Sequence, residues 1–419
     1  MNSVSGTFQT PTSTGNFSVT GLPFQPAAVI FFSTFSTSDG EMVSIYTGQG
    51  WMCSSGNQGC NTQFCADNGD VAVSHGRSVA HAVYCFSDYS GTAAYLASYV
   101  SMNSDGFTLN FTTVSASAYN VSYIAIGGSG LSVEIGTLSI NGTGDFTVST
   151  LSFQPDIVLA LGRMTNSGTP SAPSLDNAEY SFGAATSSTN RYNINWNQRF
   201  AYNSDARNDK FLKQVAEEPG NTYISADLVS MNSDGFTVNN TTTGFLRTYN
   251  WLAIKFPNST DVALGTFAQP TSTGNNSITS LSFKPGVVLM YSIGTASYSL
   301  VNVTANISHG IFSSSANRSA TWIGGFDYSI SYDGFSSSRF NSDKAIVLKT
   351  QNNSSGSTTL NAQADAVSMN SDGFTLNWDT VDATARNIIY VAFADEPLGG
   401  PWPFHFDNAL SGGMRGMGL

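Results

Sequence analysis

The chain has 419 residues and a formal net charge of −12, with 11% charged and 12% aromatic residues. This composition excludes a fold built mainly from amphipathic helices, whose wet faces need Glu, Lys, Arg and Ala, and it favours short strands with many turns. An acidic surface repels phosphate groups, so we expect no nucleic-acid partner.

The sequence also lacks the apolar segments that direct proteins into or across membranes. No run of about eighteen apolar residues occurs, so we expect no membrane insertion. The first residues, Met1–Phe8, contain neither a basic nor an apolar region. We therefore expect no secretory signal peptide and synthesis in a cytoplasm.

Two phrases recur at domain-sized intervals. Val-Ser-Met-Asn-Ser-Asp-Gly-Phe-Thr begins at Val100, Val229 and Val367. Upstream of each copy lies a Phe-x-Pro phrase, spaced by 129 and 130 residues, at Phe24, Phe153 and Phe283. Such self-similarity predicts tandem copies of one folding unit. We call them repeat 1 (1–130), repeat 2 (131–260) and repeat 3 (261–396), followed by a tail (397–419).

In chain order, each repeat opens with a turn-forming loop and an apolar run. The loops read as hairpin turns because they are rich in Pro, Gly, Ser and Thr, or in Gly and Asp; they lie at 11–15, 142–145 and 270–274. The runs are short, unbroken and preceded by proline, which predicts strands covered on both faces; they lie at 28–32, 157–161 and 287–291.

The second half of each repeat begins at the Asn-Ser-Asp-Gly turn, whose glycine tolerates positive φ. From it runs an alternating strand, in which Phe107, Leu109 and Phe111 share one face. A last apolar run closes the unit, at 121–126, 251–254 and 389–393. The sequence therefore predicts an all-β protein of three tandem antiparallel β-sandwich modules with a short irregular C-terminal tail.

The middle of each repeat differs from the others, and we expect function to lie in these inserts, since loops on a common scaffold usually diverge for binding. The insert of repeat 1 carries Trp51 and all four cysteines, repeat 2 carries a charged insert (191–218), and repeat 3 carries Trp322. The cysteines could form two disulfides or remain buried thiols; a zinc site ranks third, since no Cys-x-x-Cys pair occurs. These are Cys53, Cys60, Cys65 and Cys85.

Candidate catalytic residues have simpler structural explanations. The aspartates of the repeated turn, Asp105, Asp234 and Asp372, fit backbone capping in a turn. His75 and His309 each precede a glycine, and we match them to Phe182, which indicates a packing position. No nucleophile elbow, phosphate loop or dinucleotide fingerprint occurs, so we expect no enzyme activity, no metal and no cofactor.

The Phe-x-Pro strand, the Asp-Gly-Phe-Thr strand and the closing strand together resemble the H-type lectin module. That resemblance implies a six-stranded antiparallel sandwich, trimers and sugar binding. Tandem modules of this kind also resemble those of tailed-phage virion proteins such as tail fibres, head fibres and decoration proteins. By this resemblance the chain would be located in the virion.

Aromatic residues outside the repeated frame are the candidates for contacts. Trp51, Trp196 and Trp322 lie in the inserts near Asn, Ser and Asp, so we predict that they bind carbohydrate, with packing under their own loops as the alternative. In the tail, Trp402, Phe404 and Phe406 are costly to leave in water, so we predict docking onto a neighbouring subunit or partner.

The sequence thus predicts a non-enzymatic structural protein of a phage particle, a fibre or decoration subunit that forms homotrimers or a lattice, contacts other virion proteins and binds a host glycan. One alternative is an architectural tube or capsid subunit without a ligand. Another is a polysaccharide depolymerase, whose paired carboxylates would be Asp67 with Asp70 or Asp39 with Glu41.

Overall fold

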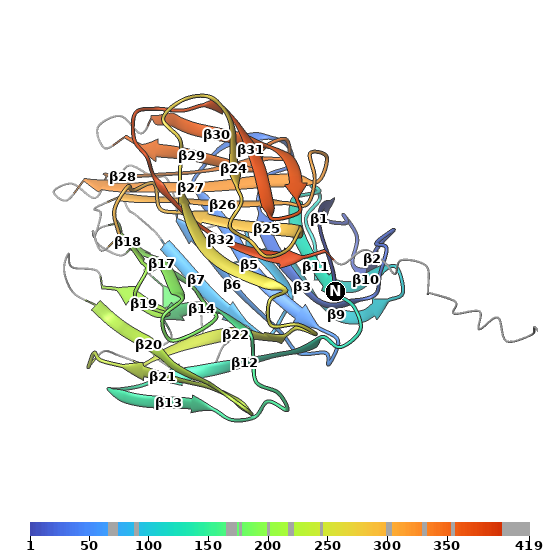
Figure 1. The fold of residues 1–419 in the computed structure, drawn as a ribbon. Helices are drawn as coiled ribbons and strands as arrows, with labels where there is room; N and C mark the ends of the chain where they lie inside the picture. Colours follow the sequence, from blue (N-terminus) through green and yellow to red (C-terminus); the bar gives the residue numbers. More distant parts are fainter. Residues whose placement is uncertain are drawn as a thin grey trace, which may run out of the picture.

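The prediction of an all-β chain is confirmed by a computed structural model, in which every regular element of the described residues is a strand and the sheets are antiparallel (Figure 1). The structure describes residues 1–65, 74–87, 92–164, 174–175, 178–198, 202–216, 222–243, 246–298, 304–328, 333–352 and 357–395.

Repeat 1 forms a large sheet and a four-stranded sheet. The large sheet runs in the order β1 (Asn2–Gln9), β11 (Asn120–Gly127), β3 (Pro26–Thr34), β5 (Ile45–Cys53), β6 (Gln58–Cys65) and β7 (Ser74–Val79). The four-stranded sheet runs in the order β2 (Gly15–Thr20), β10 (Gly106–Thr113), β9 (Ala93–Asn103) and β8 (Val83–Phe86).

Repeat 2 has the same strand order. Its large sheet consists of β12 (Ser132–Ile140), β22 (Arg247–Lys255), β14 (Ile157–Met164), β16 (Ala178–Ala185), β17 (Arg191–Gln198) and β18 (Tyr202–Arg207). Its four-stranded sheet consists of β13 (Gly144–Val148), β21 (Gly235–Asn240), β20 (Thr222–Asn232) and β19 (Leu212–Val215).

Repeat 3 follows the same plan again. The large sheet contains β23 (Val262–Ala268), β32 (Asn387–Ala394), β25 (Pro285–Ser292), β26 (Thr304–Phe312), β27 (Arg318–Tyr328) and β28 (Asp333–Asn341). The four-stranded sheet contains β24 (Gly274–Ile278), β31 (Gly373–Thr380), β30 (Thr358–Asn370) and β29 (Ile346–Gln351).

The repeated turn phrase has the structure expected from its residues. Gly235 begins β21 with φ of +153°, and a Cβ there would lie 1.9 Å from the carbonyl oxygen of Val148, so only glycine fits. Just before the turn, the pairing of β20 with β21 skips Val229, which is a β-bulge. Equivalent bulges leave all three phrase valines 40–45% exposed, namely Val100, Val229 and Val367.

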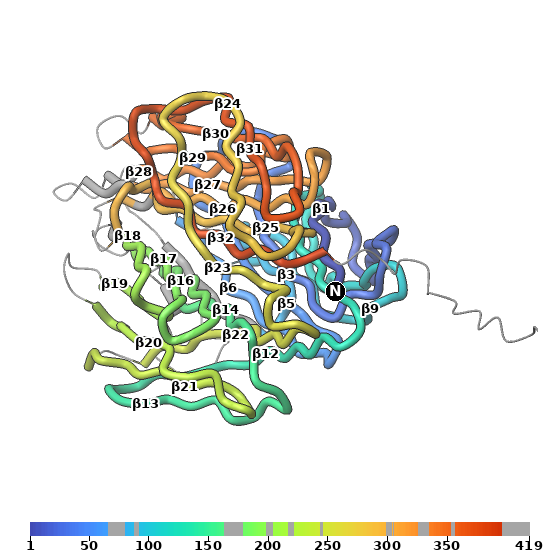
Figure 2. Tube along the Cα trace, in the orientation of Figure 1, coloured from blue at the N-terminus to red at the C-terminus, as the bar shows by residue number. Residues whose placement is uncertain are grey.

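Each large sheet is buried on both faces. One face packs on the four-stranded sheet of the same repeat, through separate apolar clusters in the three repeats. The opposite faces contribute to a single cluster that draws on all three repeats, which we call the shared core. β25 lies between β32 and β26 in its sheet (Figure 2). Every residue of β25 is buried, and strands of this kind are therefore continuous apolar runs.

Two short strands cross from one repeat to another, which the sequence did not predict. β4 (Gly40–Val43), from repeat 1, pairs with the edge strand β28 of repeat 3. β15 (Ser174–Leu175), from repeat 2, pairs with the edge strand β7 of repeat 1. These additions cover exposed sheet edges.

Candidate functional site

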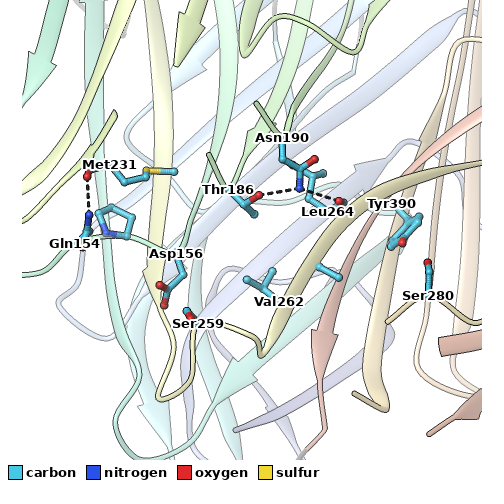
Figure 3. A pocket seen from close by; sticks show the side chains of 12 residues that line it. Gln154, Asp156, Thr186, Asn190, Met231, Ser259, Val262, Leu264, Ser280 and Tyr390 are labelled. Carbon is cyan, nitrogen blue, oxygen red and sulfur yellow. Dashed lines mark hydrogen bonds between the residues drawn. The ribbon is translucent and has the colours of Figure 1, made fainter. Parts of the chain in front are cut away.

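A groove with a volume of about 620 Å³ lies between repeats 2 and 3, and we call it the seam groove (Figure 3). This volume is within the range of small-ligand sites, roughly 300–1,000 Å³. Repeat 2 supplies one wall, with Gln154, Pro155, Asp156, Thr186, Asn190, Met231 and Ser259. Repeat 3 supplies the other, with Val262, Ala263, Leu264, Ser280 and Tyr390.

The two repeated phrases meet in the repeat 2 wall. Gln154 stands in the Phe-x-Pro phrase, and its Nε2 donates to the carbonyl oxygen of Met231, in the Val-Ser-Met phrase, at 2.6 Å. Next to it, Asp156 accepts a hydrogen bond from the backbone N–H of Phe256 at 2.7 Å, through Oδ2. Segments far apart in the sequence thus form one rigid polar wall.

Asn190 connects this wall to repeat 3. It closes the turn between β16 and β17, and its Nδ2 donates to Thr186 Oγ1 at 2.9 Å and to the carbonyl oxygen of Leu264, on β23, at 3.1 Å (Figure 3). The Asn190 amide therefore joins the two walls of the groove.

Tyr390, on β32, lies in the repeat 3 wall above Gly265. A Cβ at Gly265 would lie 2.6 Å from the Tyr390 hydroxyl oxygen, so the glycine makes room for the ring. Only 5% of Tyr390 is exposed, and burial raises the pKa of its hydroxyl. The Tyr390 hydroxyl therefore stays protonated at neutral pH. Among the residues that line the groove, Asp156 is the one acidic side chain, and the others are uncharged.

A second, smaller groove of about 290 Å³ is built from the same elements of repeat 3. Lys284 and Pro285 occupy the places of Gln154 and Pro155, and Val367, Ser368 and Met369 come from the repeated valine phrase. Its remaining lining residues are Gly286, Ser313, Ser314, Ser315 and Asp395. The repeated phrases thus line related grooves, a role that the sequence analysis missed although their repetition could have indicated it.

The three tryptophans predicted to bind carbohydrate are not on the surface. Trp51 and Trp196 are 0% exposed and Trp322 is 1% exposed. Trp51 and Trp196 pack in the shared core, while the Trp322 indole N–H donates to the Lys349 carbonyl oxygen at 3.0 Å. The prediction of sugar platforms was wrong, because the inserts form inner strands of the large sheets rather than loops.

Of the two alternatives left open for the cysteines, disulfides or buried thiols, the structure has free thiols. All four are buried; these are Cys53, Cys60, Cys65 and Cys85. Burial raises the pKa of Cys85 to about 12 and raises that of Cys60 as well, which keeps both as unreactive thiols.

Two ion pairs of repeat 2 are buried, and one of them lies within the charged insert (191–218). Arg247 and Glu179 are each 1% exposed and form an ion pair, with Arg247 Nε 3.3 Å from Glu179 Oε2. Lys213 pairs with Asp205, which is fully buried. None of these four residues lines either groove described above, so a structural role explains them better than catalysis.

Asp39 and Glu41, one of the predicted carboxylate pairs, connect repeats 1 and 3. Asp39 accepts hydrogen bonds from Ser342, and Glu41 forms an ion pair with Arg339 at 3.6 Å and another with Lys349. Burial lowers the pKa of Lys349 to about 8. The other predicted pair, Asp67 with Asp70, and the tail residues Trp402, Phe404 and Phe406 lie outside the described residues.

His309 and His75 do not occupy equivalent positions in their repeats, contrary to the prediction. On β26 it pairs with Tyr291, as Gln49 on β5 pairs with Phe32 and Phe182 on β16 pairs with Leu161. The match of His309 with Phe182 therefore holds, whereas the match with His75, which lies on β7, was wrong. The equivalent residue of repeat 1 is Gln49.

In the shared core, His309 belongs to a polar cluster made by all three repeats. Its Nε2 lies 3.2 Å from the Tyr180 hydroxyl, which donates to Gln49 Oε1 at 2.8 Å. Gln49 Nε2 donates to the Tyr291 hydroxyl at 2.7 Å. Burial lowers the pKa of His309 from 6.5 to about 3, so the imidazole is neutral in the folded protein.

This lowered pKa predicts acid sensitivity. The unfolded chain binds a proton at His309 below about pH 6.5 and the folded chain does not, so the stability contribution is complete above that pH and declines as pH falls. Between pH 7 and pH 5 we expect His309 to account for a loss of about 1–2 kcal/mol in the free energy of unfolding. Urea denaturation of the unmodified chain and His309→Gln at both pH values measures it; an equal acid loss in both would contradict the prediction.

No family model, no curated protein and no solved structure matches the chain. Among the residues that the structure describes, no group of three or more His, Cys, Asp or Glu side chains could hold a metal ion. Across the same residues, no helix has the length and apolar character needed to cross a membrane.

Proposed function

We propose that this chain is a non-enzymatic structural protein of a phage particle, a surface-presented fibre or decoration subunit built from three copies of one β-sandwich module. In this role it contacts other virion proteins and binds a host-surface glycan in the seam groove. The location in a virion rests on the resemblance of the repeats to tailed-phage proteins.

The single observation that carries the binding proposal is the meeting of the repeated phrases in the groove wall. Gln154 and Met231 come from the two phrases and are joined by a hydrogen bond of 2.6 Å. The groove also brings together amide, hydroxyl and carboxylate groups from two repeats, which suit the hydroxyl groups of a sugar. We therefore place the proposed glycan site in the seam groove and not in the inserts.

The packing of the large sheets supports a structural role rather than a catalytic one. Both faces of each large sheet are occupied by packing, and two ion pairs of repeat 2 are buried inside it, Lys213 with Asp205 and Arg247 with Glu179. A protein whose sheets are packed on both faces is suited to holding binding grooves in fixed positions.

A blocking substitution tests the groove. Ser280 is exposed in the repeat 3 wall, so Ser280→Trp should fill the groove and lower glycan binding at least about tenfold, a loss of about 1.4 kcal/mol. Thr273→Trp is the matched control, since Thr273 is exposed on the loop before β24 and does not line the groove. Binding is measured on a glycan array that includes the host's surface polysaccharides.

The alternatives give distinct outcomes. If the unmodified protein retains no sugar, a purely architectural subunit is favoured and the groove proposal fails. Release of oligosaccharides from the host polysaccharide would instead identify a depolymerase. Detection of this chain by mass spectrometry in purified phage particles tests the location separately, and its absence there would contradict the virion assignment.

A further inference from the structure

We infer that the three repeats close into a ring within one chain, so that a single chain is already the complete threefold unit. From the sequence we expected homotrimers or a lattice of this chain. In a closed ring, the surface that repeat 3 would offer to a second copy is already covered by repeat 1. The inference concerns assembly and does not depend on what the seam groove binds.

The first support is a turn that recurs at the same place in each large sheet. It joins β5 to β6, β16 to β17 and β26 to β27, and in each case an asparagine carbonyl oxygen accepts from the backbone N–H four residues earlier. The three bonds measure 3.0, 3.0 and 2.9 Å and are closed by Asn57, Asn190 and Asn317. The turns are therefore equivalent parts of the three repeats.

The turns of repeats 1 and 2 each contact the first strand of the following repeat. From the turn of repeat 1, Ser55 Oγ lies 3.4 Å from Glu134 Oε1 on β12, and Asn57 Nδ2 also donates to that oxygen. From the turn of repeat 2, Asn190 Nδ2 donates to the Leu264 carbonyl oxygen on β23 at 3.1 Å. Repeat 1 therefore holds repeat 2, and repeat 2 holds repeat 3.

The turn of repeat 3 makes the same kind of contact with repeat 1. Ser5, on β1, donates through Oγ to the Asn317 carbonyl oxygen at 3.0 Å, and its Oγ lies 3.0 Å from Ser313 Oγ. Ser122 of repeat 1 and Ser319 of repeat 3 meet nearby, with their Oγ atoms 2.7 Å apart. Contacts that run from each repeat to the next and return to the first form a closed ring.

A second set of contacts runs in the opposite direction around the ring. β4 of repeat 1 pairs with repeat 3, and β15 of repeat 2 pairs with repeat 1. At the corresponding place between repeats 3 and 2, Ser204 Oγ on β18 donates to the Thr304 carbonyl oxygen at 2.6 Å. Each pair of repeats is thus joined by both kinds of contact.

The two ends of the described chain meet at the closing seam. Ser3 Oγ donates to the carbonyl oxygen of Ala394, the last residue of β32, at 3.2 Å. The end of repeat 3 therefore lies beside the start of repeat 1. In the same way, repeats 1 and 2 each end beside the start of the repeat that follows them in the chain. Because the repeats are covalently linked, their effective concentration is in the millimolar range, which favours closure within one chain over exchange between chains.

A disulfide across the closing seam tests the ring. The Oγ atoms of Ser5 and Ser313 are 3.0 Å apart, so the double variant Ser5→Cys/Ser313→Cys should oxidise readily. We expect the loss of two free thiols per chain and a product with the mass of one chain, 44.3 kDa, by light scattering and by denaturing electrophoresis without reductant. The single variant Ser5→Cys is the control, because any loss of thiols in it would come from a reaction between the introduced thiol and the buried native cysteines.

Two results would overturn the inference. Covalent dimers or larger ladders would show that repeat 3 pairs with repeat 1 of another chain, and failure to lose the two thiols would show that the seam does not form. For the unmodified chain, a stable species of three chains at all concentrations would mean that one chain is not the complete unit.

Discussion

Replacing Arg247 with Leu is expected to lower the free energy of unfolding by about 3–5 kcal/mol. Arg247 on β22 and Glu179 on β16 are each 1% exposed, and the guanidinium carbon also lies 4.2 Å from the centre of the Tyr223 ring. The substitution removes the positive charge and leaves the Glu179 carboxylate in the interior of repeat 2. A buried charge without its counterion costs far more than the pair itself contributes.

Denaturation by guanidinium chloride measures this effect, with two comparisons. The double variant Glu179→Met/Arg247→Met removes both charges and should lose less stability than Arg247→Leu alone. Arg207→Ala breaks the pair with Asp209, whose side chain is 48% exposed, and should cost at most about 1 kcal/mol. If Arg247→Leu costs no more than Arg207→Ala, the pair is not buried as described.

Replacing Trp51 with Ala is also expected to cost about 3–5 kcal/mol, because it removes a large side chain from a closely packed interior. Trp51 is 0% exposed on β5, where it pairs with Ile30 and Gly59, and it belongs to the shared core. Because that core joins the three repeats, we expect the transition to shift as a whole rather than in repeat 1 alone.

Trp51→Phe, which keeps an aromatic ring in place, should cost less than Trp51→Ala and serves as the comparison. Thermal and chemical denaturation give the stabilities, and glycan binding is measured below the unfolding transition. A protein that loses glycan binding with Trp51→Ala while keeping its stability would restore the carbohydrate role that its burial argues against.

The predicted match between the histidines depended on knowing which positions of the repeats correspond. The glycine that follows each histidine in the sequence suggested that His75 corresponds to His309. Strand pairing shows instead that Gln49 is the residue of repeat 1 that corresponds to His309. The inserts differ in length, so correspondence along the sequence is lost between the repeated phrases. Only the hydrogen-bonded register of the sheets restores it.

By itself the sequence determined the strand content, the repeated turns and the strands on either side of them. Alternating residues such as Phe107, Leu109 and Phe111 are 0% exposed, and the turn glycines have positive φ, as local periodicity and backbone sterics require. These properties depend on residues a few positions apart, which a single sequence displays directly.

Only the tertiary structure decided what covers the inserts and where the grooves lie. An insert that contains Trp51 or Trp196 looks the same in a sequence whether solvent or another repeat covers the side chain. The shared core, the exchanged strands β4 and β15 and the seam groove all arise from contacts between residues that are distant in the chain. Local patterns carry no information about such contacts, because the energy of burial depends on the surface that meets each strand and not on its neighbours in sequence.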